Sequence, residues 1–170
     1  LLRKINPVLN LYSGDEIPSE SQLGAKSDPA FSASTEKPGR PTVLAVDDKA
    51  NVLDLLKEYL GDRFNLETAD GGKAALAAIM KKDYDCIFLD LSMPDLSGLE
   101  VLNLYLQKTK DTEIENRIVA MTLRSTQQDI LGATNLGVQA FLYKPFTGAD
   151  MAKAIDQVMG SRKVSSLLKL

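Results

Sequence analysis

Short apolar runs alternate along the chain with segments whose apolar residues recur every three to four positions. Residues 43–46, 87–89, 118–121 and 140–143 are continuous apolar runs, which are typical of strands buried on both faces. Residues 64–69 alternate between apolar and polar side chains, which predicts a strand open to solvent on one face. The pattern therefore predicts five strands.

Helical periodicity fills the intervals between these strands. The predicted helices are residues 52–60, 74–80, 99–107 and 127–136, and a last segment from Thr147 to Gly160. Thr147 and Asp150 have the spacing of a capping box at the start of the last helix. Five alternations of strand and helix within about 120 residues predict the α/β class.

Strands that are apolar throughout need helices on both faces of their sheet, so we expect a doubly wound, five-stranded parallel sheet. Five strand–helix units are too few for an eight-stranded barrel. Ligands of such open sheets bind beyond the carboxyl ends of the strands, where the strand order reverses. The residues that follow each predicted strand are therefore the first place to look for chemistry.

Four segments of different character divide the chain. Residues 1–12 have a short apolar pattern broken by Pro7, and are expected to be the end of an upstream element or a docking segment. Residues 13–41 are rich in Ser, Pro, Gly and charge, which is typical of a flexible linker. Residues 42–160 form the predicted domain, and residues 161–170 a basic tail or an extension of the last helix. The chain does not begin with Met, and we expect it to be a piece of a longer protein.

Composition removes several classes of function. Residues 41–160 carry a net charge of about −6, which disfavours nucleic-acid binding by this part of the chain. No apolar run approaches the roughly 20 residues of a membrane helix. Cys86 is the single cysteine and histidine is absent, so an internal disulfide is excluded and a zinc site would lack its usual ligands. We expect a cytoplasmic protein.

Polar side chains follow four of the predicted strands. Asp47 and Asp48 end the first, Asp90 the third, Thr122 the fourth and Lys144 the fifth. Each has an ordinary interpretation: Asp48 as a helix N-cap, Asp90 as a turn residue, Thr122 as a β-branched strand end, and Lys144 as a solvated cation. Together they are harder to explain, because three neighbouring carboxylates repel one another unless a cation lies among them. Oxygen ligands of this kind favour Mg²⁺.

The chain resembles the receiver domains of bacterial response regulators. The resemblance covers about residues 41–160 and lies in four signatures, VLAVDD at 43–48, DLSMPDLSG at 90–98, IVAMT at 118–122 and YKPF at 143–146. It implies a flavodoxin-like topology with strand order 2-1-3-4-5. It also implies a two-component signalling switch that a histidine kinase or a phosphotransfer protein phosphorylates.

The resemblance assigns roles to particular residues. Asp90 is the implied phosphoacceptor. Mg²⁺ is the implied cofactor, held by Asp48, Asp90 and the backbone carbonyl of Ser92, with Asp47 acting through water. An aspartyl phosphate hydrolyses readily, so an aspartate nucleophile suits a phosphorylation signal that lasts a short time.

The remaining implied roles concern the phosphoryl group and its effects. Thr122 and Lys144 would bind the phosphoryl group, and Thr122 and Phe141 would act as the switch. The peptide bond between Lys144 and Pro145 is one that the family often keeps cis. We expect a possible dimer or effector contact through the fourth helix, the fifth strand and the last helix.

Two positions depart from the common pattern of the family. The residue after Thr122 is usually small, and here it is Leu123, which puts the rate of phosphotransfer in doubt. Ser92 and Arg124 stand at positions where the family varies and tunes dephosphorylation. Access to the site and the lifetime of the mark are therefore expected to depend on Ser92, Leu123 and Arg124.

Other functions remain open. The chain could be a receiver-like scaffold whose acidic pocket is not used in signalling. A phosphatase of the haloacid dehalogenase type also uses an aspartyl nucleophile, but it needs a second Asp where this chain has Ser92. The 40 residues before the first strand favour a receiver carried behind another domain, as in hybrid histidine kinases. We do not expect an enzyme beyond its own phosphoryl transfer and dephosphorylation.

Overall fold

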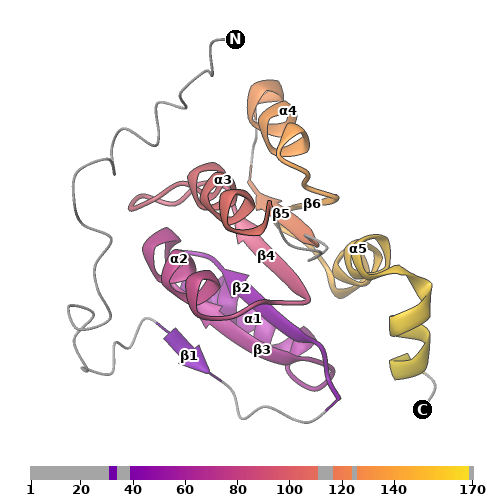
Figure 1. Cartoon of the computed structure of the whole chain (residues 1–170). Coiled ribbons are helices and arrows are strands. Elements are labelled where there is room, and N and C mark those ends of the chain that lie inside the picture. Colours follow the sequence, from indigo (N-terminus) through magenta and orange to yellow (C-terminus); the bar gives the residue numbers. More distant parts are fainter. Residues whose placement is uncertain (1–30, 34–38, 111–116, 124–125, 169–170) are drawn as a thin grey trace.

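Five parallel strands form the centre of the molecule in the computed structural model, which describes residues 31–33, 39–110, 117–123 and 126–168 (Figure 1). The strands of the whole sheet are β1 Phe31–Ala33, β2 Thr42–Val46, β3 Asn65–Ala69, β4 Cys86–Asp90, β5 Ile118–Thr122 and β6 Ala140–Tyr143, and all of them except β1 are parallel. The helices are α1 Ala50–Leu60, α2 Gly72–Lys81, α3 Gly98–Thr109, α4 Gln127–Asn135 and α5 Gly148–Leu168. The parallel strands run in the order β3-β2-β4-β5-β6, which confirms the predicted order 2-1-3-4-5.

The sheet has a sixth strand, β1, that the sequence analysis did not predict. β1 pairs antiparallel with β3, with Phe31 opposite Ala69 and Ala33 opposite Glu67. Its three residues lie within the segment 13–41 that was predicted to be a linker, and three residues are too few to show a period. The rest of that predicted linker up to residue 38, and all of residues 1–12, lie outside the described residues.

β3 is buried along its whole length, so the prediction of a strand with one open face was wrong. The polar residue at its centre, Glu67, is 4% exposed. Its carboxylate accepts a hydrogen bond from the Tyr84 hydroxyl at 2.6 Å and forms an ion pair with Lys82. Both partners come from the turn after α2, and they satisfy a carboxylate that burial would otherwise penalise.

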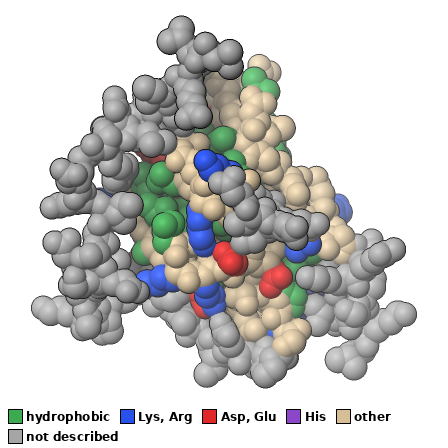
Figure 2. All heavy atoms as spheres, viewed as in Figure 1, with side chains coloured by type: hydrophobic (Ala, Val, Ile, Leu, Met, Phe, Trp, Pro, Cys, Tyr) green, Lys and Arg blue, Asp and Glu red, His purple; other side chains and the backbone are tan. Residues whose placement is uncertain are grey.

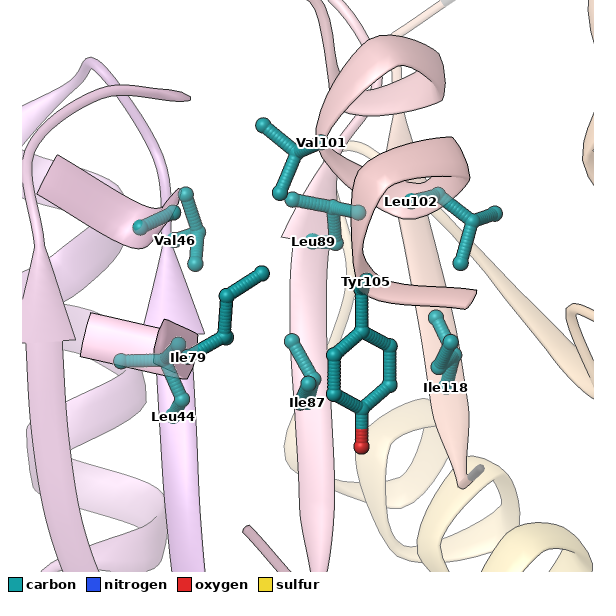
Figure 3. A pocket seen from close by; sticks show the side chains of 10 residues that line it. Leu44, Val46, Ile79, Ile87, Leu89, Val101, Leu102, Tyr105 and Ile118 are labelled. Carbon is teal, nitrogen blue, oxygen red and sulfur yellow. The ribbon is translucent and has the colours of Figure 1, made fainter. Parts of the chain in front are cut away.

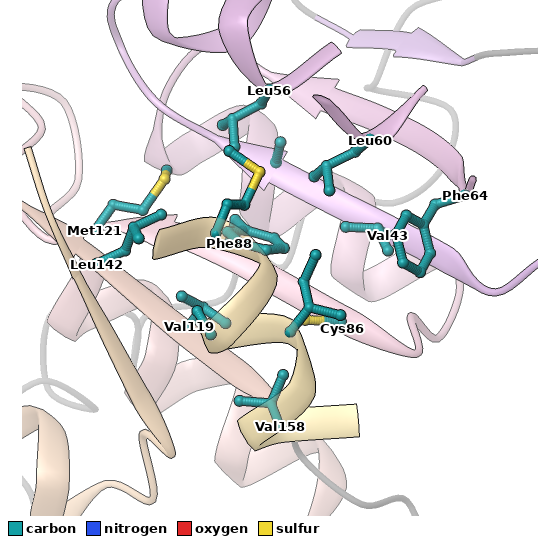
Figure 4. Close-up of a cluster of buried hydrophobic side chains, with 14 of the residues drawn as sticks. Val43, Leu56, Leu60, Phe64, Cys86, Phe88, Val119, Met121, Leu142 and Val158 are labelled. Atoms are coloured by element: carbon teal, nitrogen blue, oxygen red, sulfur yellow. The ribbon is translucent and has the colours of Figure 1, made fainter. Parts of the chain in front are cut away.

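Helices cover both faces of the sheet. On one face, α1 and α5 pack over a core that includes Val43, Phe88, Val119 and Val158 (Figure 4). On the other, α2, α3 and α4 cover a second core. Between the sheet and α2 and α3 this second core leaves a gap of only about 10 Å³ among mainly apolar side chains (Figure 3). Such a gap is too small and too apolar to hold a ligand or a well-bound water molecule.

Three of the helices begin with a capping box at the carboxyl end of a strand. Thr147 and Asp150 exchange the expected hydrogen bonds at the start of α5, which confirms the predicted box. Ser97 with Glu100 does the same for α3, and Thr126 with Asp129 for α4. The helix starts that follow the strand ends are therefore fixed by local sequence.

The last helix differs from the prediction at its end. Gly160, with φ of +66°, interrupts the helical backbone where the sequence analysis placed the end of the helix. A further helical segment then continues to Leu168, within the predicted tail or extension 161–170.

None of the helices in the described part of the chain has the length and apolar character needed to cross a bilayer. On the face seen in Figure 2, Lys and Arg side chains lie interspersed with Asp and Glu.

Gly98 is required for close packing rather than for an unusual backbone angle. A Cβ atom at this position would lie 2.2 Å from the carbonyl oxygen of Asp90 and 2.8 Å from the Cα of Leu91. Real Cβ atoms do not approach backbone atoms so closely, and backbone yields less than a flexible side chain. The first residue of α3 therefore packs directly on the end of β4.

We predict that Gly98→Ala lowers the free energy of unfolding by about 1–3 kcal/mol, as overpacking of a core commonly does. Gly132→Ala in α4 is the matched control, since its Cβ would meet only Leu99 Cδ1, at 3.9 Å. The control should raise stability by about 0.5–1 kcal/mol, the helix propensity gained. Urea denaturation measures both, and equal effects of the two substitutions would contradict the packing argument.

Candidate functional site

Three carboxylates meet at the carboxyl ends of two neighbouring strands. Asp47 and Asp48 directly follow β2, and Asp90 is the last residue of β4. Because β2 and β4 are parallel and paired, their ends lie side by side, and one oxygen from each carboxylate lies within 4.8 Å of the others. Asp47 is 0% and Asp90 3% exposed, so two of these three charges are almost fully removed from water.

Lys144 supplies a cation to this cluster from beyond β6. Its Nζ atom forms an ion pair with Asp47 Oδ2 and lies 3.2 Å from Asp90 Oδ1. The Lys144 side chain is only 8% exposed, so the contact is screened little by solvent. The backbone N–H of Lys144 donates to the carbonyl of Thr122 at 2.8 Å, and the peptide bond to Pro145 is cis, as expected.

Several neighbouring groups shift the pKa of the Asp90 carboxyl group in opposite directions. Burial raises its pKa, the ammonium group of Lys144 lowers it, and the charge of Asp47 raises it again. The backbone N–H of Ser92, 3.4 Å from Asp90 Oδ1, also favours the ionised form. The net shift is upward from the usual value of an aspartate.

Asp48 has an oxygen that the protein does not satisfy. Its Oδ2 atom pairs with Lys49 Nζ at 2.7 Å, whereas Oδ1 is buried without a hydrogen-bond partner among the described residues. Both oxygens of Asp47, by contrast, accept from protein donors, Oδ1 from the Lys49 N–H at 3.0 Å and Oδ2 from Lys144. An unsatisfied buried carboxylate oxygen beside two further carboxylates fits a hard cation with oxygen ligands, and so fits Mg²⁺.

The other predicted site residues surround this cluster unevenly. Thr122 ends β5, the strand next to β4, and is 1% exposed. Ser92 is exposed, and Leu123 is an exposed apolar side chain at 63%. Phe141 in β6 is half-buried and packs against the core under α2, α3 and α4. Arg124 lies outside the described residues.

Two further residues beside the site were not predicted from the sequence. Lys49, next to the acid pair, contacts Asp48 through its side chain and Asp47 through its backbone. Asp95, in the loop after β4, accepts hydrogen bonds from the backbone of Gly72 and Lys73 at the start of α2. The adjacent glycines 71 and 72 are a sequence signal for such a close approach, but they do not reveal its partner.

Comparison with known families and curated proteins gives a consistent result. The family described as "Response regulator receiver domain" matches residues 43–156. The chain is 30% identical over 119 residues to chemotaxis protein CheY-3 of Vibrio cholerae serotype O1, covering 68% of this chain and 89% of that protein. It is 27% identical over 128 residues to the nitrate/nitrite response regulator protein NarL of Escherichia coli K12, covering 74% of this chain and 57% of that protein.

Solved structures agree on the fold. The chemotaxis protein CheY4 of Vibrio cholerae superposes with a TM-score of 0.65 at 26% identity, covering 71% of this chain and 99% of that one. A CheY-like receiver domain protein of Methanospirillum hungatei gives a TM-score of 0.66 at 21% identity, covering 75% of this chain and 99% of that one. At that identity the second structure supports the fold alone.

Proposed function

Because the chain belongs to the response regulator receiver domain family, we propose that it is a signalling switch that is phosphorylated on Asp90. Receiver domains act as switches rather than as enzymes that turn over a free substrate. The donor would be a phosphohistidine of a histidine kinase or of a phosphotransfer protein. The observation that carries the proposal is the meeting of Asp47, Asp48, Asp90 and Lys144 at one edge of the sheet.

The proposed reaction transfers one phosphoryl group. An Asp90 carboxylate oxygen attacks phosphorus, the new O–P bond forms, and the P–N bond to the donor histidine breaks with its electron pair left on the imidazole nitrogen. Asp48, Asp90 and the Ser92 carbonyl would hold Mg²⁺ directly, and Asp47 through water. When bound, Mg²⁺ neutralises charge on the phosphoryl oxygens.

Lys144 and Thr122 would complete the binding of the phosphoryl group. Lys144 already lies between Asp47 and Asp90, so its ammonium group is held where an incoming anion needs a positive charge. Thr122 stands at the end of the adjacent strand with a hydroxyl that can donate to a phosphoryl oxygen. Both side chains are buried, which supports the idea that they are already in place before the phosphoryl group binds.

Acetyl phosphate with Mg²⁺ should add one phosphoryl group to the protein by intact mass. Asp90→Asn should abolish labelling, because an amide oxygen is a poor nucleophile and forms no stable acyl phosphate. Asp54→Asn makes the same chemical change at an exposed carboxylate of α1 and should label like the original protein. Equal labelling of the Asp90 variant would show that the acceptor is another residue, and no labelling at all would favour the phosphorylation-independent scaffold.

Asp48→Ala should weaken Mg²⁺ binding and yet stabilise the protein in EDTA. The substitution removes a direct ligand, but it also removes an unsatisfied buried oxygen and one of three repelling charges, worth about 1 kcal/mol. Isothermal titration calorimetry measures the affinity and urea denaturation the stability. Asp54→Ala is the control for loss of one negative charge and should leave Mg²⁺ affinity unchanged. An unchanged affinity in Asp48→Ala would contradict the assigned ligands.

Leu123 should limit access to Asp90. Its exposed side chain follows directly on Thr122, at the position where the resemblance to receiver domains implies a small residue. Leu123→Ala should therefore speed labelling by acetyl phosphate, whereas Leu131→Ala, the same truncation at a 60% exposed position in α4, should not. A rate that stays the same or falls in Leu123→Ala would reject this role.

Ser92 and Arg124 are proposed to tune the rate of dephosphorylation. The loss of label after removal of acetyl phosphate measures this rate in the same assay.

We propose that Thr122 and Phe141 form the switch, and that α4, β6 and α5 form the surface that a dimer or an effector reads. Thr122 pairs with Tyr143 across β5 and β6, and Phe141 pairs with Ala120, so the two residues lie on neighbouring strands two register positions apart. α4 has a single buried residue, Ala133, and contains Gly132, so it can shift at little cost.

Beryllofluoride with Mg²⁺, a stable mimic of the phosphoryl group, should shift backbone NMR signals mainly within residues 122–150. The reason is that Thr122 would move toward the bound group and Phe141 would fill the space left behind it. Asp90→Asn is the control and should show no such shifts. Changes confined to the surroundings of Asp47, Asp48 and Asp90 would show that this surface does not carry the signal.

A further inference from the structure

Asp95 connects the loop after Asp90 to a helix that contributes no ligand to the acidic site. Its Oδ1 atom accepts a hydrogen bond from the backbone N–H of Gly72 at 3.0 Å, and Oδ2 from that of Lys73 at 2.9 Å. These two N–H groups belong to the first turn of α2, where a helix has donors without internal partners. The contact joins residues that are 23 and 22 positions apart in sequence.

The glycines at the start of α2 shape the contact. A Cβ atom on Gly72 would lie 2.1 Å from the carbonyl oxygen of Leu96. On Gly71 it would lie 3.0 Å from Asp95 Oδ2. The loop after β4 therefore packs against bare backbone. A side chain at position 72 would push the loop backbone away, and one at position 71 would crowd the Asp95 carboxylate.

Electrostatics favour the ionised form of Asp95 in this contact. Burial raises its pKa, but hydrogen bonds from the backbone of Lys73, Gly72 and Leu96 outweigh burial and bring the pKa below its usual value. A depressed pKa means that the contact stabilises the folded protein above the ordinary pKa of aspartate, and that this stabilisation is lost as pH falls. At neutral pH the carboxylate is therefore a fixed negative charge at the positive end of α2.

The loop between β4 and α3 is held at both ends. Leu91 donates to the carbonyl of Met121 at 3.0 Å and accepts from the N–H of Gly98 at 3.2 Å. Between these points Ser92 and Pro94 are exposed. The hydrogen bonds of Asp95 to the start of α2 attach the loop to a helix other than the one it leads into. Residues that are restrained before a ligand binds lose less conformational entropy when it does.

We infer that Asp95 is a positioning residue, which restrains the loop carrying the Ser92 carbonyl and so raises the Mg²⁺ affinity of the acidic site. The inference rests on the proposed function, because it takes Ser92 as a metal ligand. In this proposal the start of α2 supports the metal site indirectly. It holds Asp95, and Asp95 restrains the loop that carries the Ser92 carbonyl. Supporting contacts of this kind commonly set metal affinity.

Calorimetric titration of the folded protein with Mg²⁺ tests the inference. Asp95→Ala should weaken binding by between about threefold and tenfold, at or below the loss typical of supporting residues in metal sites. Asp95→Asn should recover part of the loss, since its amide oxygen still accepts one N–H bond. Gly71→Ala should weaken binding to a smaller extent, because its new Cβ would lie 3.0 Å from Asp95 Oδ2 and crowd the same carboxylate.

Lys108→Met is the matched control. Lys108 ties α3 to the far end of α2, where its Nζ donates to the Ile79 carbonyl at 2.5 Å and pairs with Asp83 at 3.0 Å. This variant loses a contact between the same two helices and should keep the original Mg²⁺ affinity. If it weakens binding as much as Asp95→Ala does, general loosening explains the effect and the inference is wrong.

A second measurement, amide hydrogen exchange, uses only the original protein. In EDTA, the amide protons of Gly72 and Lys73 should exchange slowly in the original protein, because Asp95 accepts both. Fast exchange of both would overturn the inference, as would an unchanged Mg²⁺ affinity in Asp95→Ala. Failure of the proposed function is a different result, in which the original protein neither binds Mg²⁺ nor is labelled on Asp90.

Discussion

Repulsion among Asp47, Asp48 and Asp90 is the constraint on which the rest of the site depends. One oxygen of each carboxylate lies within 4.8 Å of the others, and two unit charges at that separation repel by about 3 kcal/mol at an effective dielectric constant near 20. Lys144 offsets part of this cost from within the cluster, and Lys49 part of it from an exposed position. Two lysines do not balance the charge of three carboxylates, so the cluster keeps a net negative charge that a divalent cation would neutralise.

Most of this arrangement could be predicted from the sequence, because parallel strands bring the residues that follow them to one edge. The apolar runs that end in Asp47, Asp90 and Lys144 are identified as strands because they alternate regularly with helical segments along the chain. β3 was recognised as a strand but misjudged in its burial, since a buried Glu67 looks like an exposed one until its partners are known. Lys82 and Tyr84 lie 15 and 17 residues away, and no periodicity connects them to Glu67.

The parts that could not be predicted are contacts between distant segments. Gly98 ends the signature at residues 90–98, and the sequence does not reveal that its role is to let α3 lie against the backbone of Asp90. Asp95 looks like a solvated acid between Pro94 and Leu96, and its bonds to α2 depend on a loop geometry that propensity does not encode. In both cases the residue type is compatible with several roles, and only packing between segments selects one of them.

The antiparallel strand β1 has a consequence for how this protein behaves among its own copies. In a parallel sheet of this order β3 would be an edge strand, with a row of N–H and C=O groups available to pair with another chain. β1 pairs with three residues of that row within the same molecule. β1 is then the edge strand itself, and its three residues make it a very short one, which limits the pairing offered to another chain. A receiver trimmed to begin at β2 would instead present the five residues of β3 as an open edge for strand addition.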